Sequence, residues 1–193
     1  MASEYRLVSY AEGGSAQAGV LVNDRVVPAA ALLQGGGIDA SSVLALLHTW
    51  DTSHARLAAA AETVKPGDGF ALAGVKLLAP ILYPGALYCA GANYWDHLEE
   101  MAEIAKRVTG KAPPMVKGKD PYFFMKTTTA SIIGTKTPAR LPPFSSQVDW
   151  EAELGVVIGK TARKVAEGEA FDVVAGYLIV NDLSARDLMK REG

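Results

Sequence analysis

The sequence is poor in cysteine and has no excess of positive charge. Cys89 is the only cysteine among 193 residues, so no internal disulfide can form, and a reducing, cytoplasmic location is expected. No charged leader followed by an apolar core marks the chain for export. The 19 Lys and Arg face 21 Asp and Glu, which gives a formal charge of −2. Because binding to a phosphate backbone needs clustered positive charge, we expect no nucleic-acid partner.

Long apolar runs are also missing. The longest, such as residues 77–81 and 177–180, are far shorter than the roughly 20 residues that a membrane-spanning helix needs. We therefore expect no membrane partner. At 49% hydrophobic residues, the chain still has enough apolar material for one full domain, or for one small and one incomplete domain.

The first part of the chain predicts a small α+β domain. Short strands are expected at residues 6–10, 18–22 and 25–27. Residues 41–62 are rich in Ala and Leu and predict one or two helices, capped by Ser41 or Ser42. Residues 35–37 are three glycines with no phosphate-binding lysine after them, so we interpret them as a flexible connection and not as a nucleotide loop.

The second part predicts strands punctuated by Gly and Pro, and we place a domain boundary between residues 1–76 and 77–193. Strands are expected at residues 87–91, 122–126, 148–158 and 176–181. A helix is predicted from about His97 to Val108, with Asp96 as N-cap and Gly110 just past its end.

The strand at residues 148–158 alternates acidic and apolar side chains. A period of two places Asp149, Glu151 and Glu153 on one face and an apolar set on the other, which we expect to pack a core. Carboxylates on one face lie about 7 Å apart and repel unless something positive lies between them. A divalent cation would supply that charge, and all-carboxylate ligation favours Mg²⁺ or Mn²⁺ over zinc. The alternative is a solvated acidic face.

Asp182 adds a third candidate ligand. It ends the strand at residues 176–181, before Ser184, which we expect to cap a following helix. Two Glu from one strand and an Asp from the end of another can form a set of three oxygens that Mg²⁺ accepts. The candidate metal ligands are therefore Glu151, Glu153 and Asp182.

His97 and Glu100 are candidates for acid–base chemistry. They lie three residues apart on one predicted helix, so their side chains can touch. A carboxylate beside an imidazole fixes its tautomer and raises its basicity, which suits a general base acting on water. The alternative is a histidine with a structural role. The same helix carries an apolar stripe formed by Leu98, Met101, Ile104, Ala105 and Val108.

Taken together, these segments resemble the fumarylacetoacetate hydrolase superfamily. The matching stretches are GANYWDHLEEM at residues 91–101, FFMK at 123–126, DWEAELGVVIGK at 149–160, and GY to NDLSARD at 176–187. They occur in the family's order and cover about residues 77–193. The resemblance implies an α+β fold, in which a small N-terminal domain precedes a mixed β-sandwich roll around a Mg²⁺ or Mn²⁺ site. It also implies a homodimer.

The resemblance further implies roles for individual residues. Carried over by motif, Glu151, Glu153 and Asp182 are metal ligands, His97 and Glu100 form a dyad that activates water, and Lys126 belongs to a strand on the substrate side. Family members act on 2-oxo acids that carry a second carbonyl or an enol. We therefore expect a hydrolase that cleaves a C–C bond in a small 2,4-diketo acid. Two alternatives stay open, an isomerase or decarboxylase of a 2-hydroxy-dienoate diacid in aromatic catabolism, and a non-catalytic assembly or ligand-binding fragment.

One departure from the family pattern concerns the end of the sequence. The family places another catalytic lysine, and strands that complete the roll, beyond the segment that matches residues 184–187. Here residues 188–193 have the pattern of a helix that continues, and not of the end of a fold. We expect a catalytic domain that is incomplete at its C-terminus, as a fragment of a longer chain or as a truncated homologue completed by a partner.

Overall fold

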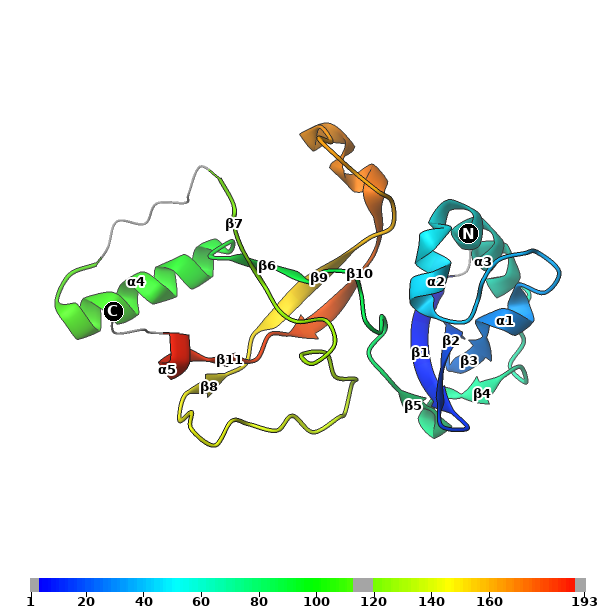
Figure 1. Ribbon diagram of the computed structural model, residues 1–193, viewed down its shortest axis with the longest axis horizontal. Helices are drawn as coiled ribbons and strands as arrows, with labels where there is room; N and C mark the ends of the chain where they lie inside the picture. Colours follow the sequence, from blue (N-terminus) through cyan, green and yellow to red (C-terminus); the bar gives the residue numbers. More distant parts are fainter. Residues whose placement is uncertain (1–3, 113–119, 190–193) are drawn as a thin grey trace. The chain divides into compact units, whose positions relative to one another are not determined.

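The computed structural model describes residues 4–112 and 120–189 (Figure 1). Contacts between residues divide the chain into two compact units, Met1–Leu82 together with Ile133–Gly193, and Tyr83–Ile132. The domain boundary at residues 76 and 77 stays a prediction. Helices and strands are mixed along the chain, as expected for the α+β class. No described helix is both long enough and apolar enough to cross a membrane.

An antiparallel sheet of five strands is formed by the start of the chain. In order across the sheet the strands are β4 (Phe70–Ala71), β3 (Arg25–Pro28), β2 (Ser15–Val22), β1 (Arg6–Glu12) and β5 (Lys76–Leu77). The turn between β1 and β2 uses Gly13 and Gly14 with φ of 56° and 84°, a left-handed backbone that glycine adopts without a steric penalty. The three strands predicted in this region are confirmed.

Three helices accompany this sheet and help to build its core. They are α1 (Ala29–Leu32), α2 (Val43–His48) and α3 (Trp50–Ala61). Of the two predicted caps, Ser42 is the one used, because its side chain accepts a hydrogen bond from the Ala45 N–H at 3.0 Å. Val20, Leu46 and Leu57 are fully buried in one hydrophobic cluster, which joins the sheet to α2 and α3. A short 3₁₀ helix, η1 (Leu72–Gly74), links β4 to β5.

The described part of the unit Tyr83–Ile132 contains one strand pair and one long helix. The strands β6 (Tyr88–Gly91) and β7 (Tyr122–Met125) pair antiparallel, and α4 (Trp95–Thr109) lies between them in sequence. The helix ends at Gly110 with φ of 75°, as predicted. Its start was predicted too late, since Asp96 lies in the first turn and not at the N-cap. There the Asp96 carboxylate accepts a hydrogen bond from the His97 N–H at 2.9 Å.

A long hairpin makes up most of the remaining chain. Its strands are β8 (Val148–Asp149), β9 (Ala152–Ile158), β10 (Val174–Asn181) and β11 (Ser184–Ala185), with the 3₁₀ helix η2 (Glu167–Val173) before β10 and α5 (Arg186–Met189) at the end. β9 pairs with β10, and β8 pairs with β11, both antiparallel. The predicted strand 148–158 is thus divided at Trp150 and Glu151.

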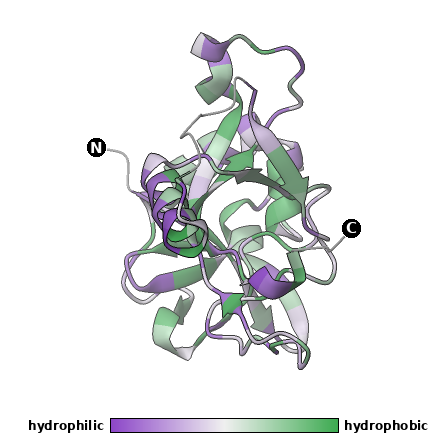
Figure 2. Cartoon of the chain, turned by 90° about the vertical axis from the view of Figure 1, so that its left-hand side faces the viewer, coloured by the Kyte–Doolittle hydropathy of each residue, from purple (hydrophilic) through white to green (hydrophobic). Residues whose placement is uncertain are grey.

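One face of β9 and β10 differs from expectation. Trp150, Leu154 and Val156 belong to the apolar set that was predicted to pack a core, but their exposed fractions are 71%, 57% and 50%. The opposite face of β9 is the one that packs, because Val157 contacts the hydrophobic cluster of the N-terminal sheet and helices. Within the unit that contains β9, no described residue buries the first face, which explains why the prediction was wrong there. Hydrophobic residues colour much of the strands green in Figure 2.

Candidate metal centre

Three carboxylates of the long hairpin lie close together. Glu151 lies in the interruption between β8 and β9, Glu153 lies in β9, and Asp182 directly follows β10. One oxygen from each residue lies within 4.8 Å of the others. Both glutamates are half-buried, and Asp182 is buried with an exposed fraction of 8%. The three residues predicted as metal ligands therefore form one group, which we call the carboxylate group.

The backbone of the hairpin sets the positions of these three side chains. Glu153 is the direct cross-strand partner of Val180, two residues before Asp182. Where the ladder is interrupted, the Asp182 N–H donates to the Glu151 carbonyl at 2.9 Å. The Glu151 N–H in turn donates to the Asn181 side-chain oxygen at 3.1 Å. These bonds satisfy the backbone where the strands part, and they hold Glu151 beside Asp182.

Arg186 pairs with one member of the carboxylate group. Its Nη2 donates to Glu151 Oε1 at 2.5 Å and to Asp149 Oδ2 at 2.9 Å, and its Nε donates to the same Asp149 oxygen at 3.0 Å. Partial burial of the guanidinium opposes its charge, but the hydrogen bonds to Glu151 and Asp149 outweigh this and raise the pKa of Arg186. Arg186 therefore stays cationic beside the carboxylate group.

Two residues in this neighbourhood have partners that the sequence did not reveal. Asp149 was expected to share a face with Glu151 and Glu153. Arg186 Nη2 binds both Asp149 and Glu151, but Asp149 lies outside the carboxylate group. Ser184 was expected to cap a helix, but it lies in β11, and its hydroxyl donates to Glu151 Oε2 at 3.3 Å. The one available signal was electrostatic, since a run of carboxylates demands a cation and Arg186 follows shortly after Asp182.

Asp187 fastens the loop before β8 to α5. Its carboxylate accepts hydrogen bonds from the Ser145 hydroxyl at 2.6 Å and from the Ser146 N–H at 2.9 Å. The Ser145 hydroxyl, together with the Ser146 N–H, lowers the pKa of Asp187 below its usual value. The Arg186 N–H adds a backbone bond to the Gln147 carbonyl at 2.8 Å. These hydrogen bonds of Asp187 and of the Arg186 N–H hold the turn that carries the Arg186 side chain.

The chemistry of the carboxylate group suits a hard divalent cation. All three donors are carboxylate oxygens, which Mg²⁺ and Mn²⁺ accept and which zinc sites seldom use alone. Around Mg²⁺, ligand oxygens about 2.1 Å from the ion lie about 3 to 4 Å from one another. The oxygens of the carboxylate group lie within 4.8 Å of one another, which is close to that range. The residues therefore fit Mg²⁺ or Mn²⁺.

The residues predicted for acid–base and substrate roles all lie in the unit Tyr83–Ile132. His97 is half-buried and Glu100 is exposed on α4, and no hydrogen bond between their side chains occurs in the described part of the chain. Lys126 is half-buried and directly follows β7, where its N–H donates to the Leu87 carbonyl at 3.3 Å. The roles of His97, Glu100 and Lys126 stay predictions.

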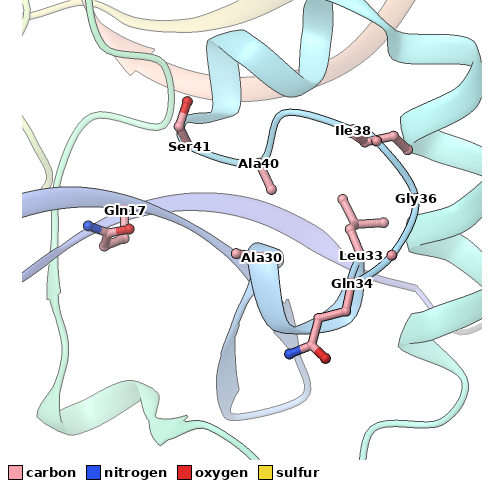
Figure 3. A pocket seen from close by; sticks show the side chains of 10 residues that line it. Gln17, Ala30, Leu33, Gln34, Gly36, Ile38, Ala40 and Ser41 are labelled. Atoms are coloured by element: carbon pink, nitrogen blue, oxygen red, sulfur yellow. The ribbon is translucent and has the colours of Figure 1, made fainter.

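A hollow of about 300 Å³ lies in the N-terminal part of the chain (Figure 3). The glycines at 35–37 line it, with Gln17, Gln34 and Ser41 among their neighbours. Gly35 and Gly37 have φ of 75° and 67°, so the loop depends on glycine at these positions. The residues that line this hollow include no carboxylate and no imidazole. It therefore offers no alternative centre for metal or acid–base chemistry.

The comparison with protein families agrees with the geometry of the carboxylate group. The fumarylacetoacetate (FAA) hydrolase C-terminal family matches residues 86–193, which is more than half of the chain. The chain therefore belongs to the fumarylacetoacetate hydrolase superfamily, whose members include hydrolases, isomerases and tautomerases. Family enzymes use divalent metals.

Individual relatives carry names from several of these activities. Oxaloacetate tautomerase fahd2 of Xenopus laevis is 41% identical over 121 residues, which is 62% of this chain and 34% of the relative. A solved maleylpyruvate hydrolase from Sphingobium sp., in complex with manganese(II) and pyruvate, is 25% identical with a TM-score of 0.66, over 94% of this chain and 59% of that chain. A probable 2-hydroxyhepta-2,4-diene-1,7-dioate isomerase from Mycobacterium abscessus is 30% identical with a TM-score of 0.65, over 95% and 53%.

The chain spans only part of the length of these relatives, and this limits which of their properties can be assigned to it. The alignments with the two solved structures include nearly all of this chain but little more than half of each relative. The alignment with the tautomerase includes about a third of that protein. The predicted α+β fold of the fumarylacetoacetate hydrolase type is confirmed. The activity and substrates of a whole protein are matters for proposal.

Proposed function

We propose that this chain supplies the divalent-metal site of an enzyme that acts on a small 2-oxo acid. The observation that carries the proposal is the carboxylate group of Glu151, Glu153 and Asp182, in a chain of the fumarylacetoacetate hydrolase superfamily. The solved relative that contains manganese(II) and pyruvate, itself a 2-oxo acid, supports both the ion and the substrate class.

The residues of the carboxylate group would hold the ion, and their environment positions them for this role. A bound Mg²⁺ or Mn²⁺ would supply Lewis-acid stabilisation of the negative charge that develops when a 2-oxo acid becomes an enolate. Burial of Asp182 keeps bulk water from its carboxylate, which strengthens its attraction for a cation. The backbone bonds between Glu151 and Asp182 preorganise the two side chains before any ion binds.

Tautomerisation of an oxaloacetate-like acid is the reaction that the relatives favour. The relative with 41% identity carries that name, whereas the solved hydrolase is 25% identical. In this reaction a proton moves between carbon and oxygen of the substrate, and no bond to water forms. It is an isomerisation, like the alternative that the sequence left open, but that alternative named a 2-hydroxy-dienoate diacid as the substrate.

C–C hydrolysis of a 2,4-diketo acid is the second candidate, and the solved maleylpyruvate hydrolase favours it. In this reaction Glu100 orients His97, and His97 takes a proton from water so that hydroxide attacks the distal carbonyl. The C–C bond then breaks, and the proton returns to the carbon atom of the departing enolate. Lys126, as a cation on the substrate side, would bind the carboxylate of the acid.

Metal binding tests the proposal directly. Titration of the 193-residue chain with Mn²⁺, followed by the electron paramagnetic resonance signal of free Mn²⁺, should show one site. Glu153→Gln and Asp182→Asn should weaken binding by at least about 10-fold, because each removes a charged ligand. Glu169→Gln, which changes an exposed carboxylate of η2, is the matched control and should bind as the unmodified chain does. Equal binding by all variants would overturn the site.

Activity assays separate the two reactions. With Mg²⁺ present, the absorbance of enol-oxaloacetate reports tautomerisation, and the diketo absorbance of an acylpyruvate reports hydrolysis. His97→Ala should abolish hydrolysis and leave tautomerisation, since only hydrolysis needs an activated water. Metal binding without turnover of either substrate would favour the alternative of a ligand-binding fragment.

A further inference from the structure

We propose that Arg186, anchored by Asp149, holds Glu151 as a ligand that offers one oxygen to the ion, and that this makes the site prefer Mg²⁺ to Ca²⁺. The inference rests on the proposed metal site and adds a specificity-determining residue to it. Arg186 acts here through Glu151 and is a positioning residue.

The contacts of Arg186 form a fixed fork. Two guanidinium nitrogens, Nε and Nη2, hold Asp149 Oδ2 at 3.0 and 2.9 Å, and Nη2 also holds Glu151 Oε1 at 2.5 Å. The side chains of Arg186 and Glu151 are 33% and 23% exposed, so water only partly screens this pair. A planar guanidinium bound at two nitrogens to Asp149 cannot turn away without losing charge-assisted hydrogen bonds.

Each oxygen of the Glu151 carboxylate has a donor of its own. Oε1 accepts from Arg186 at 2.5 Å, whereas Oε2 accepts the longer bond of 3.3 Å from the Ser184 hydroxyl. A carboxylate that chelates an ion must turn both oxygens toward it. The strong bond to Arg186 opposes that rotation, and Oε2 is left as the oxygen that Glu151 can offer to an ion.

Mg²⁺ and Ca²⁺ differ in how strongly their binding depends on a second oxygen from Glu151. Mg²⁺ is small, requires octahedral coordination and takes one oxygen from each carboxylate, whereas Ca²⁺ takes six to eight oxygens and commonly chelates a carboxylate. A Glu151 that is held to one oxygen therefore suits Mg²⁺ and deprives Ca²⁺ of a ligand. Residues that orient a metal ligand change metal affinity by about 10- to 100-fold.

The positive charge of Arg186 has a separate effect, which the test must remove. A cation near the site repels every divalent ion, so its loss would tighten the binding of Mg²⁺ and Ca²⁺ alike. The ratio of the two dissociation constants cancels this effect, because both ions carry the same charge. The ratio therefore reports the geometry of Glu151 alone.

The experiment measures the dissociation constants of Mg²⁺ and Ca²⁺ for the 193-residue chain by competition with Mn²⁺, using the resonance signal of free Mn²⁺. Arg186→Lys keeps the charge but loses the fork, and Asp149→Asn weakens the anchor with almost no change in shape. In both variants the ratio of the Ca²⁺ to the Mg²⁺ constant should fall by about 10-fold. Arg163→Lys, at an exposed arginine in the loop after β9, is the matched control and should leave the ratio unchanged.

The outcomes separate this inference from the metal site itself. A ratio that stays within about twofold of the starting value in the folded variants overturns the role of Arg186, even where both affinities change together. Failure of the unmodified chain to bind any of the three ions overturns the metal site and the inference with it. If circular dichroism shows that Arg186→Lys does not fold, the ratio measured for Asp149→Asn decides.

Discussion

Arg186 and Asp187 are neighbours in sequence, and their side chains bind different parts of the structure around the candidate site. Arg186 binds Asp149 and Glu151, while Asp187 binds the loop at Ser145 and Ser146. The sequence marks both residues only as part of a family motif. Their partners lie more than thirty residues earlier in the chain, so local pattern could not reveal the contacts.

The hydrogen bonds to Asp187 predict a pH-dependent contribution to stability. Its pKa is lower in the folded chain than the value of about 3.9 in an unfolded chain. The stabilisation is therefore fully present above about pH 4 and is lost as the pH falls through the folded pKa. Asp187→Asn should unfold at lower urea concentration than the unmodified chain at about pH 7, and this difference should shrink as the pH falls below about 4.

Urea denaturation at a series of pH values, followed by circular dichroism, measures this difference. Asp172→Asn changes an exposed aspartate of η2 and serves as the control. A difference between Asp187→Asn and the unmodified chain that stays constant down to the lowest pH would contradict the pKa argument.

At the scale of elements, the end of a helix that depends on local chemistry was predicted better than the end of a strand that depends on pairing with another strand. Gly110 ends α4 as expected, because a left-handed C-cap needs only glycine at that position. The division of the strand at 148–158 was missed, because it depends on where Asn181 and Asp182 meet Glu151 across the hairpin. The residues of the predicted apolar stripe all lie in α4, and three of them, Met101, Ile104 and Val108, are 50%, 48% and 79% exposed.

The cap of α2 provides a test at this scale. Ser42→Ala removes the acceptor for the Ala45 N–H, and the free energy of unfolding should fall by about 1 kcal/mol. Ser41→Ala is the matched variant, at the neighbouring serine that does not cap the helix, and it should cost less. Equilibrium denaturation measures both, and a larger loss for Ser41→Ala would show that the cap is assigned to the wrong serine.

At the scale of the whole molecule, the main feature is apolar surface that is exposed on β9 and β10. Beside the exposed residues of β9, Tyr177 and Ile179 on β10 are 55% and 87% exposed. Contiguous apolar surface of this kind marks an interaction site or a liability to aggregate. The expected homodimer and cytoplasmic location both stay predictions.

Self-association through this face is the corresponding prediction. The 193-residue chain should form larger species as its concentration rises, and Ile179→Lys should reduce their fraction severalfold, because a charge on an open sheet face opposes association. Sedimentation velocity at several concentrations measures the distribution. Val165→Lys introduces the same charge at a loop residue that is 38% exposed, and it should have little effect. An equal response to the two substitutions would point to net charge and not to the β9–β10 face.

The sequence by itself determined the features that depend on residue type and short spacing. It predicted the α+β class, three of the five strands of the first sheet, the end of α4, and an oxygen-rich group of Glu151, Glu153 and Asp182. Only the tertiary structure decided that Asp149 pairs with Arg186, that the Ser184 hydroxyl donates to Glu151, and which face of β9 packs against the N-terminal cluster. The reason is physical: these outcomes depend on pairing between β8 and β11 and between β9 and β10, strands that are separated along the chain, and no local pattern specifies that register.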